Sequence, residues 1–92
     1  MELDNLNEQS EFKAMGKGRI ISESGNKKLM LNFISWNGKQ PVFDLRVWRE
    51  QDGKAQATKG ILLTEQEIET LRDLLNKHQD IKQLFTDAEN QL

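Results

Sequence analysis

Alternating apolar and polar positions are clearest in the middle of the chain. In the stretch FDLRVW, the apolar residues Phe43, Leu45 and Val47 alternate with Asp44, Arg46 and Trp48. Successive side chains of a β-strand point to opposite faces of a sheet, so this stretch predicts a strand with two different faces. We expect the apolar face to be the core, which places Trp48 on the opposite, otherwise polar face.

Three further stretches have strand-like patterns and complete a predicted sheet of four strands. The first is centred on residues 19–22, the second covers 28–36 and the fourth covers about 57–63. Turn signals separate the strands at residues 24–26, at Asn37-Gly38 and at Asp52-Gly53. Pro41 is expected at the entrance of the third strand, where its missing N–H is tolerated. The strands therefore follow one another as a meander.

The period of the pattern changes after residue 63. Residues 64–67, TEQE, match a capping box, in which the Thr64 hydroxyl accepts from the Glu67 N–H and the Glu67 side chain reaches back. Apolar residues then recur at helical spacing, at Ile68, Leu71, Leu74, Leu75, Ile81 and Phe85. A helix over 65–90 would be roughly 39 Å long, whereas four strands at about 4.8 Å spacing span less than about 20 Å. We expect the helix either to break near residues 78–80 or to place its end on a second copy.

These elements predict an α+β fold, with a four-stranded antiparallel sheet followed by a C-terminal helix (β-β-β-β-α). The 92 residues are enough for one small domain, with 36% hydrophobic and 30% charged residues. A chain this small and polar gains stability from burying surface against a second copy, which favours a homo-oligomer. Residues 1–13 have no clear period and are expected to form a flexible acidic segment, and residues 14–92 to form the folded domain.

The residue inventory argues against several classes of chemistry. The chain has no cysteine and a single histidine, His78, so thiol nucleophiles and multi-histidine metal sites are excluded. No serine is paired with His78 by a recognisable spacing, no glycine–lysine stretch has phosphate-loop spacing, and no paired carboxylates stand out. We expect a protein that is not an enzyme and needs no cofactor. No apolar run reaches membrane-spanning length and residues 1–4 lack a basic secretory start, so a cytoplasmic location is expected.

The net charge of −2 conceals an uneven distribution along the chain. Residues 1–12 carry four acidic residues and no Lys or Arg, for a net charge of −4. Residues 13–60 carry ten Lys or Arg and four acidic residues, for +6, whereas residues 61–92 carry three Lys or Arg and seven acidic residues, for −4. A basic middle therefore lies between two acidic ends. Such a region favours a polyanionic partner, although solvated surfaces are charged in any case.

Both tryptophans lie in this basic region, each at the end of a predicted strand. Arg46 shares the predicted polar face with Trp48, and Lys39 lies in the hairpin that follows Trp36. Aromatic rings with interleaved cations suit single-stranded nucleic acid, whose bases stack on them at about 1–3 kcal/mol each. The alternative is that both tryptophans belong to the core, since this residue type is usually mostly buried. The residues alone leave both interpretations open.

Three short segments, taken together, resemble one known family. They are WNGK at 36–39, FDLRVW at 43–48 and KGILLT at 59–64. Their order and spacing resemble the C-terminal domain of the transcriptional positive cofactor four family, and most closely its small bacterial YdbC-type members, over about residues 15–78. The resemblance implies a curved four-stranded antiparallel sheet that dimerises through the helix and the sheet ridge. It also implies that single-stranded DNA binds in channels on the sheet.

The resemblance implies roles for individual residues as well. Trp36 would stack a base at the hairpin, with Lys39 beside it to neutralise a phosphate, and Arg46 and Trp48 would form the binding face of the third strand. Asn37 stands where some members have a lysine, so affinity is expected to be lower. The full set of expected nucleic-acid-binding residues is Arg19, Lys27, Lys28, Trp36, Asn37, Lys39, Arg46, Trp48 and Lys59.

The predicted function is that of a non-enzymatic single-stranded DNA-binding homodimer with little sequence preference. It would act in transcription, replication or repair, in the cytoplasm at the nucleoid. RNA is a lesser variant of the ligand, because nothing in the sequence visibly reads a 2′-hydroxyl. The alternative function is that of an adaptor that docks a polymerase or recombination protein through the same surface, with the exposed aromatic residues as hot spots.

Overall fold

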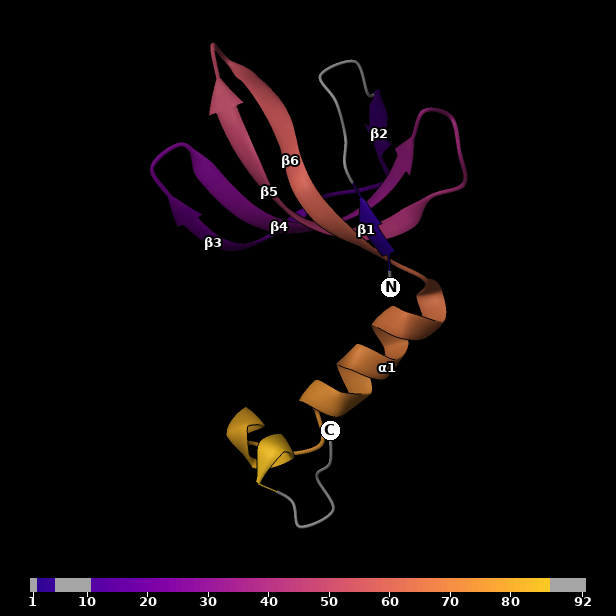
Figure 1. Ribbon diagram of the computed structural model, residues 1–92, viewed down its shortest axis with the longest axis vertical. Helices are drawn as coiled ribbons and strands as arrows, with labels where there is room; N and C mark the ends of the chain where they lie inside the picture. The colour runs from indigo at the N-terminus through magenta and orange to yellow at the C-terminus, as the bar shows by residue number, and fades with distance from the viewer. Residues whose placement is uncertain (1, 5–10, 87–92) are drawn as a thin grey trace.

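The computed structural model describes residues 2–4 and 11–86, which form one antiparallel sheet followed by two helical segments (Figure 1). The strands are β1 (Glu2–Asp4), β2 (Phe12–Ala14), β3 (Arg19–Ser24), β4 (Lys27–Trp36), β5 (Val42–Gln51) and β6 (Lys54–Leu63). The helical segments are α1 (Glu65–Leu75) and the 3-10 helix η1 (Ile81–Phe85). The predicted α+β class, with antiparallel strands followed by a helix, is therefore confirmed.

The four predicted strands are β3 to β6, and each pairs with the next as an antiparallel neighbour. At Asn37-Gly38 and at Asp52-Gly53 both residues of the turn have positive φ, between 51° and 76°. Tight hairpin turns of type I′ require this conformation, and Asn-Gly and Asp-Gly are the pairs that adopt it most easily. The turns therefore lie where the sequence predicts them.

Two short strands near the start of the chain add to the predicted four. β1 pairs with β6, and β2 pairs with the last residues of β4, beyond the part of β4 that pairs with β3. In the described part of the chain the sheet order is β1-β6-β5-β4-β2, with β3 also on β4. The prediction of four strands and a flexible segment over 1–13 missed both pairings, because three-residue strands leave too little alternation to detect. Residues 1, 5–10 and 87–92 lie outside the described residues, and the domain boundary at residue 14 stays a prediction.

The sheet curves into a trough that opens away from α1, and α1 lies below its convex side (Figure 1). The predicted alternation along β5 is present, but the burial of its two faces is reversed. Asp44, Arg46 and Trp48 are buried, at 0%, 1% and 6% exposed. Their neighbours on the other face, Phe43, Leu45 and Val47, are only half-buried. The expectation that Trp48 lies outside the core is therefore wrong.

The curvature explains this reversal. Side chains on the concave side of a curved sheet converge and cover one another, whereas those on the convex side splay apart. The main cluster of buried apolar residues accordingly lies on the concave side and consists of Ile34, Trp36 and Trp48. Polar side chains can share this buried face only because they satisfy one another's hydrogen bonds.

The helix α1 begins at the predicted capping box. Thr64 Oγ1 accepts a hydrogen bond from the Glu67 N–H at 3.1 Å, and Glu67 Oε1 accepts one from the Thr64 N–H at 2.8 Å. The helix ends at Leu75, and η1 follows after a break. Of the two alternatives for the long apolar pattern, the break is therefore confirmed.

The helix covers the convex face of the sheet only in part. It contacts β5 and β6, yet none of its residues is buried. An apolar pocket of about 350 Å³ remains between sheet and helix, and the residues that line it include Ile21, Leu31, Leu45, Ile68, Leu71 and Leu75. Phe33, on the same side, is 40% exposed. The convex face is thus apolar and incompletely covered.

Neither helical segment of residues 11–86 is long and apolar enough to cross a membrane. Within the described residues, no group of three or more His, Asp or Glu side chains is placed so that it could hold a metal ion.

Candidate nucleic-acid interface

Three aromatic side chains meet on the concave side of the sheet. Trp36, at the end of β4, and Trp48, in β5, lie stacked with ring centroids 6.0 Å apart and ring planes at 7°. Phe12 of β2 packs against both rings, at 5.5 Å from Trp36 and 5.0 Å from Trp48. Each tryptophan is 6% exposed, whereas Phe12 is 46% exposed. The part of this aromatic cluster that solvent can reach therefore belongs mainly to Phe12.

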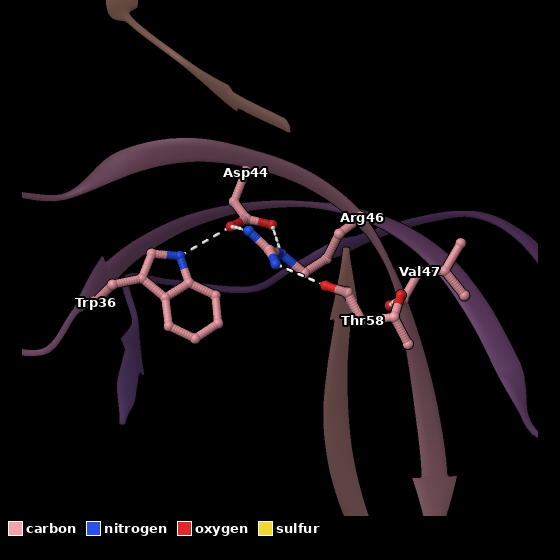
Figure 2. A network of polar contacts seen from close by, with 5 residues as sticks. All are labelled: Trp36, Asp44, Arg46, Val47 and Thr58. Atoms are coloured by element: carbon pink, nitrogen blue, oxygen red, sulfur yellow. Dashed lines mark hydrogen bonds and ion pairs between the residues drawn. The ribbon is translucent and has the colours of Figure 1, made fainter. Parts of the chain in front are cut away.

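A buried ion pair holds Trp36 in its orientation. The Asp44 carboxylate accepts two hydrogen bonds from Arg46, from Nε to Oδ1 and from Nη2 to Oδ2, both at 2.7 Å. Asp44 Oδ2 also accepts one from Trp36 Nε1 at 2.8 Å, and Figure 2 shows the indole nitrogen pointing at the carboxylate. The Arg46 guanidinium carbon lies 4.9 Å from the Trp36 ring centroid, a cation–π contact. Asp44 thus restrains both side chains at once.

Strand β6 completes the surroundings of Arg46. Arg46 Nη1 donates to the Thr58 carbonyl at 2.7 Å, and the Thr58 hydroxyl donates to the Val47 carbonyl at 2.6 Å (Figure 2). Gly60 is the cross-strand partner of Arg46, and a Cβ built on it would lie 2.4 Å from Arg46 Cβ and 2.8 Å from Arg46 Cζ. Glycine is therefore required at position 60 to leave room for the arginine side chain.

A groove runs beside the aromatic cluster. It has a volume of about 390 Å³, and β2, β4 and the β5–β6 hairpin all contribute residues to it. Among its lining residues are Phe12, Trp48, Lys28, Asn32 and Arg49. The Nε1 atom of Trp48 is buried and has no hydrogen-bond partner within the described residues. The groove thus combines aromatic walls, two cationic residues against the acidic Glu50, and an unpaired donor.

The structure brings together four of the predicted binding residues. Trp36, Arg46 and Trp48 meet on the concave side, where all three are buried, and Lys28 lines the adjacent groove. In this conformation the two tryptophans offer little free ring face. Their role in binding stays a prediction.

The other predicted residues are exposed and lie farther apart in the fold. Asn37 and Lys39 are in the β4–β5 connection, where Asn37 Oδ1 accepts a hydrogen bond from the Glu11 N–H at 2.9 Å. Arg19 is the cross-strand partner of Leu31, which lines the pocket between the sheet and α1. Arg19 therefore belongs to the convex side. The remaining two are Lys27, at the start of β4, and Lys59, in β6.

Two residues of the site were absent from the predicted set. Asp44 stands two positions before Arg46, on the same strand face, and opposite charges at this spacing are a signal for an ion pair. Phe12 lies in the segment predicted to be flexible, and its only signal is that it is the sole aromatic residue before Phe33. A lone aromatic residue without a periodic context does not indicate a binding residue.

Comparison with known sequences agrees with this geometry. Residues 22–74, more than half of the chain, match the family described as Transcriptional Coactivator p15 (PC4). The chain belongs to the PC4 family. The resemblance inferred from three short segments is therefore confirmed. The region that matches contains both tryptophans and the Asp44–Arg46 pair, whereas β1 and β2, with Phe12, lie outside it.

The chain is also similar to an individual protein, over more residues than the family match covers. An uncharacterized protein of Treponema pallidum (strain Nichols) is 39% identical over 72 residues, which cover 77% of this chain and 82% of that relative. Both chains are therefore alike over most of their length.

Proposed function

We propose that this protein binds single-stranded DNA on the concave side of its sheet, with little sequence preference and without enzymatic activity. The observation that carries the proposal is the cluster of Phe12, Trp36 and Trp48, next to a groove lined by Lys28, in a chain of the PC4 family. Bases of a single strand are free to stack on aromatic rings, whereas a duplex hides its base faces. PC4 proteins are nucleic-acid-binding proteins and transcription coactivators, which supports a role in transcription. We propose that the protein acts in the cytoplasm, at the nucleoid.

The distribution of charge along the chain favours the strands over the helix as the surface for a polyanion. Residues 13–60, which include β3, β4 and most of β6, carry the net charge of +6. The helix α1, below the convex side, carries Glu65, Glu67, Glu69 and Asp73 against Arg72. A polyanion is therefore repelled from the helix and attracted to the strands.

We also propose that the protein is a homodimer in which a second copy covers the convex side. Apolar side chains of the sheet and helix stay exposed there, among them Phe33, Leu71, Leu74 and Leu75. A large apolar patch on a small domain marks an interaction surface. A second copy supplies an apolar surface of the same kind, which would also bring two concave binding sites into one particle.

The proposal is tested by titrating a fluorescein-labelled oligo-dT with the protein and following fluorescence anisotropy. Matched duplex DNA and single-stranded RNA serve as comparison ligands, each at two salt concentrations. We expect the single-stranded DNA to bind most tightly, and its affinity to fall as salt rises, with a slope of about −0.7 for each phosphate contacted. Absence of binding at low salt would contradict the proposal, and salt-insensitive capture of a polymerase would favour the adaptor instead.

A further inference from the structure

We infer that Phe12, rather than either tryptophan, provides the ring face on which a nucleobase stacks, and that the adjacent groove between β2 and the β5–β6 hairpin receives that base. This inference rests on the proposed function. It goes further by naming a binding residue on β2, a strand that lies outside the region matched to the PC4 family. It also changes the role of the tryptophans from contact surface to support.

The first argument is accessibility. A base stacks by covering an aromatic face, so that face must be free before binding. Trp36 and Trp48 are each 6% exposed, and each has the other ring and Phe12 packed against it. Phe12 is 46% exposed although it packs on both of them. Of the three rings in the cluster, Phe12 is therefore the one that an incoming base can reach.

The second argument is that Phe12 is held in place by its backbone. It pairs with Trp36 in the β2–β4 ladder. On one side of it, the Glu11 carbonyl accepts from the Asn37 N–H at 2.9 Å, and on the other the Met15 N–H donates to the Phe33 carbonyl at 2.7 Å. The backbone of Phe12 is therefore held before and after the residue, and its ring packs on both tryptophans. Such a ring is preorganised, so little conformational entropy is lost when a base covers it. The same ties weigh against Phe12 being a loose cover that a ligand displaces.

The third argument is the chemistry of the groove. Phe12 and Trp48 both line it, and Lys28 adds a cation that can approach a phosphate. The buried Nε1 of Trp48 has no partner within the described residues. An unpaired buried donor is costly, and a carbonyl group on a base could satisfy it after a small adjustment of the ring. The groove thus offers stacking, charge and hydrogen bonding in one place.

The test compares three variants in the same anisotropy titration. Phe12→Leu keeps an apolar side chain in the cluster but removes the aromatic face, and should weaken binding of oligo-dT by at least about fivefold. Phe12→Trp restores an aromatic face and should bind about as tightly as the wild type. Phe33→Leu is the matched control, because Phe33 is 40% exposed and packs on another phenylalanine at 4.8 Å, but on the convex side. It should bind as the wild type does.

A second measurement does not depend on any variant being folded. An oligonucleotide containing 5-iododeoxyuridine is cross-linked to the wild-type protein by ultraviolet light, and the adduct is located after trypsin digestion. Cleavage after Lys and Arg separates the aromatic residues of the cluster. Phe12 is the one aromatic residue of the peptide 1–13, and Trp48 lies in the peptide 47–49. The peptide 29–39 contains both Phe33 and Trp36. We expect the adduct on peptide 1–13. An adduct confined to the tryptophan peptides would overturn the inference.

The outcomes separate this inference from the proposed function. If the wild type fails to bind single-stranded DNA, the proposed function is wrong and the inference falls with it. If the wild type binds and Phe12→Leu binds equally well, the inference alone is wrong. Tighter binding by Phe12→Leu would also overturn it, because Phe12 would then be a cover over the tryptophans rather than a platform.

Discussion

Asp44 is the residue on which the concave face depends most. Its carboxylate is fully buried and accepts hydrogen bonds from both Arg46 and Trp36. Burying a charge is expensive unless a partner and further hydrogen bonds compensate for the lost water. Here the guanidinium is compensated in the same way, through the Thr58 carbonyl. The pair is therefore tolerated as a unit, and neither member is stable there alone.

Asp44→Asn should destabilise the protein by about 3 kcal/mol or more, because it leaves the Arg46 charge buried without the carboxylate that accepts two of its hydrogen bonds. The free energy of unfolding is measured by urea denaturation at a fixed protein concentration. Asp73→Asn is the matched control, because Asp73 also accepts from an arginine Nε, that of Arg72, but at 3.1 Å and with both side chains more than half exposed. An exposed pair of this kind contributes at most about 1 kcal/mol. Equal effects of the two substitutions would refute the role given to Asp44.

Gly60→Ala should displace the Arg46 side chain, because the new methyl group would lie 2.4 Å from Arg46 Cβ. Overpacking of this kind costs about 1–3 kcal/mol, which the same urea denaturation would measure. The double variant Gly60→Ala, Arg46→Gly removes the Cβ atom that the new methyl group would meet, so its added cost over Arg46→Gly alone should be much smaller. A fully additive double variant would show that the clash with Arg46 is not the cause.

At this scale the sequence revealed which residues share a strand face but not which face is buried. The alternation of Asp44, Arg46 and Trp48 with Phe43, Leu45 and Val47 was predicted correctly, whereas the polar set proved to be the buried one. Burial depends on the curvature of the whole sheet and on the exact satisfaction of one ion pair. Neither is encoded in local hydrophobicity, so the rule that apolar residues are inside failed here.

The secondary-structure elements were easier to predict where their signals are local. Turns with Asn-Gly and Asp-Gly, and the start of α1 at its capping box, follow from side chains within a few residues of one another. The end of α1 does not, because apolar residues continue at helical spacing to Phe85 and no glycine or proline follows Leu75. The strands β1 and β2 were missed because each has only three residues and because their pairing partners are distant in the sequence.

Thr64→Ala should destabilise α1 by about 1 kcal/mol, because the Glu67 N–H loses its hydroxyl acceptor. The effect should be visible in the helical circular dichroism signal and in the free energy of unfolding, since no residue of α1 is buried to hold it by packing. Glu67→Gln keeps a side chain that can accept from the Thr64 N–H and should cost much less. A loss of helix in Glu67→Gln as large as in Thr64→Ala would count against the capping role of Thr64.

The molecule as a whole has a concave side that buries both tryptophans together with the Asp44–Arg46 pair, and an apolar convex side that its own helix leaves partly open. Small domains bury a modest share of their surface, so an uncovered apolar side is a considerable loss for a chain of this size. The proposed second copy removes this loss. It also leaves the trough free, because trough and helix lie on opposite sides of the sheet (Figure 1).

Leu74→Glu should therefore dissociate the protein into monomers, because it places a charge among the exposed apolar side chains of the convex side. Sedimentation should give about twice the chain mass of 10.7 kDa for the wild type and about the chain mass for the variant. Gln79→Glu adds the same charge at an exposed position after α1 and should remain dimeric. A wild type that sediments as a monomer at micromolar concentration would contradict the dimer.

The stacking of Trp36 on Trp48 makes the intrinsic fluorescence of this protein a local probe. The chain has two tryptophans and no tyrosine, and both indoles lie in the one aromatic cluster, with ring planes at 7°. Emission from the whole protein thus reports on a single spot in the trough. Occupation of the trough should alter that emission, whereas self-association on the convex side should leave it unchanged, so one optical signal can separate the two events without any label.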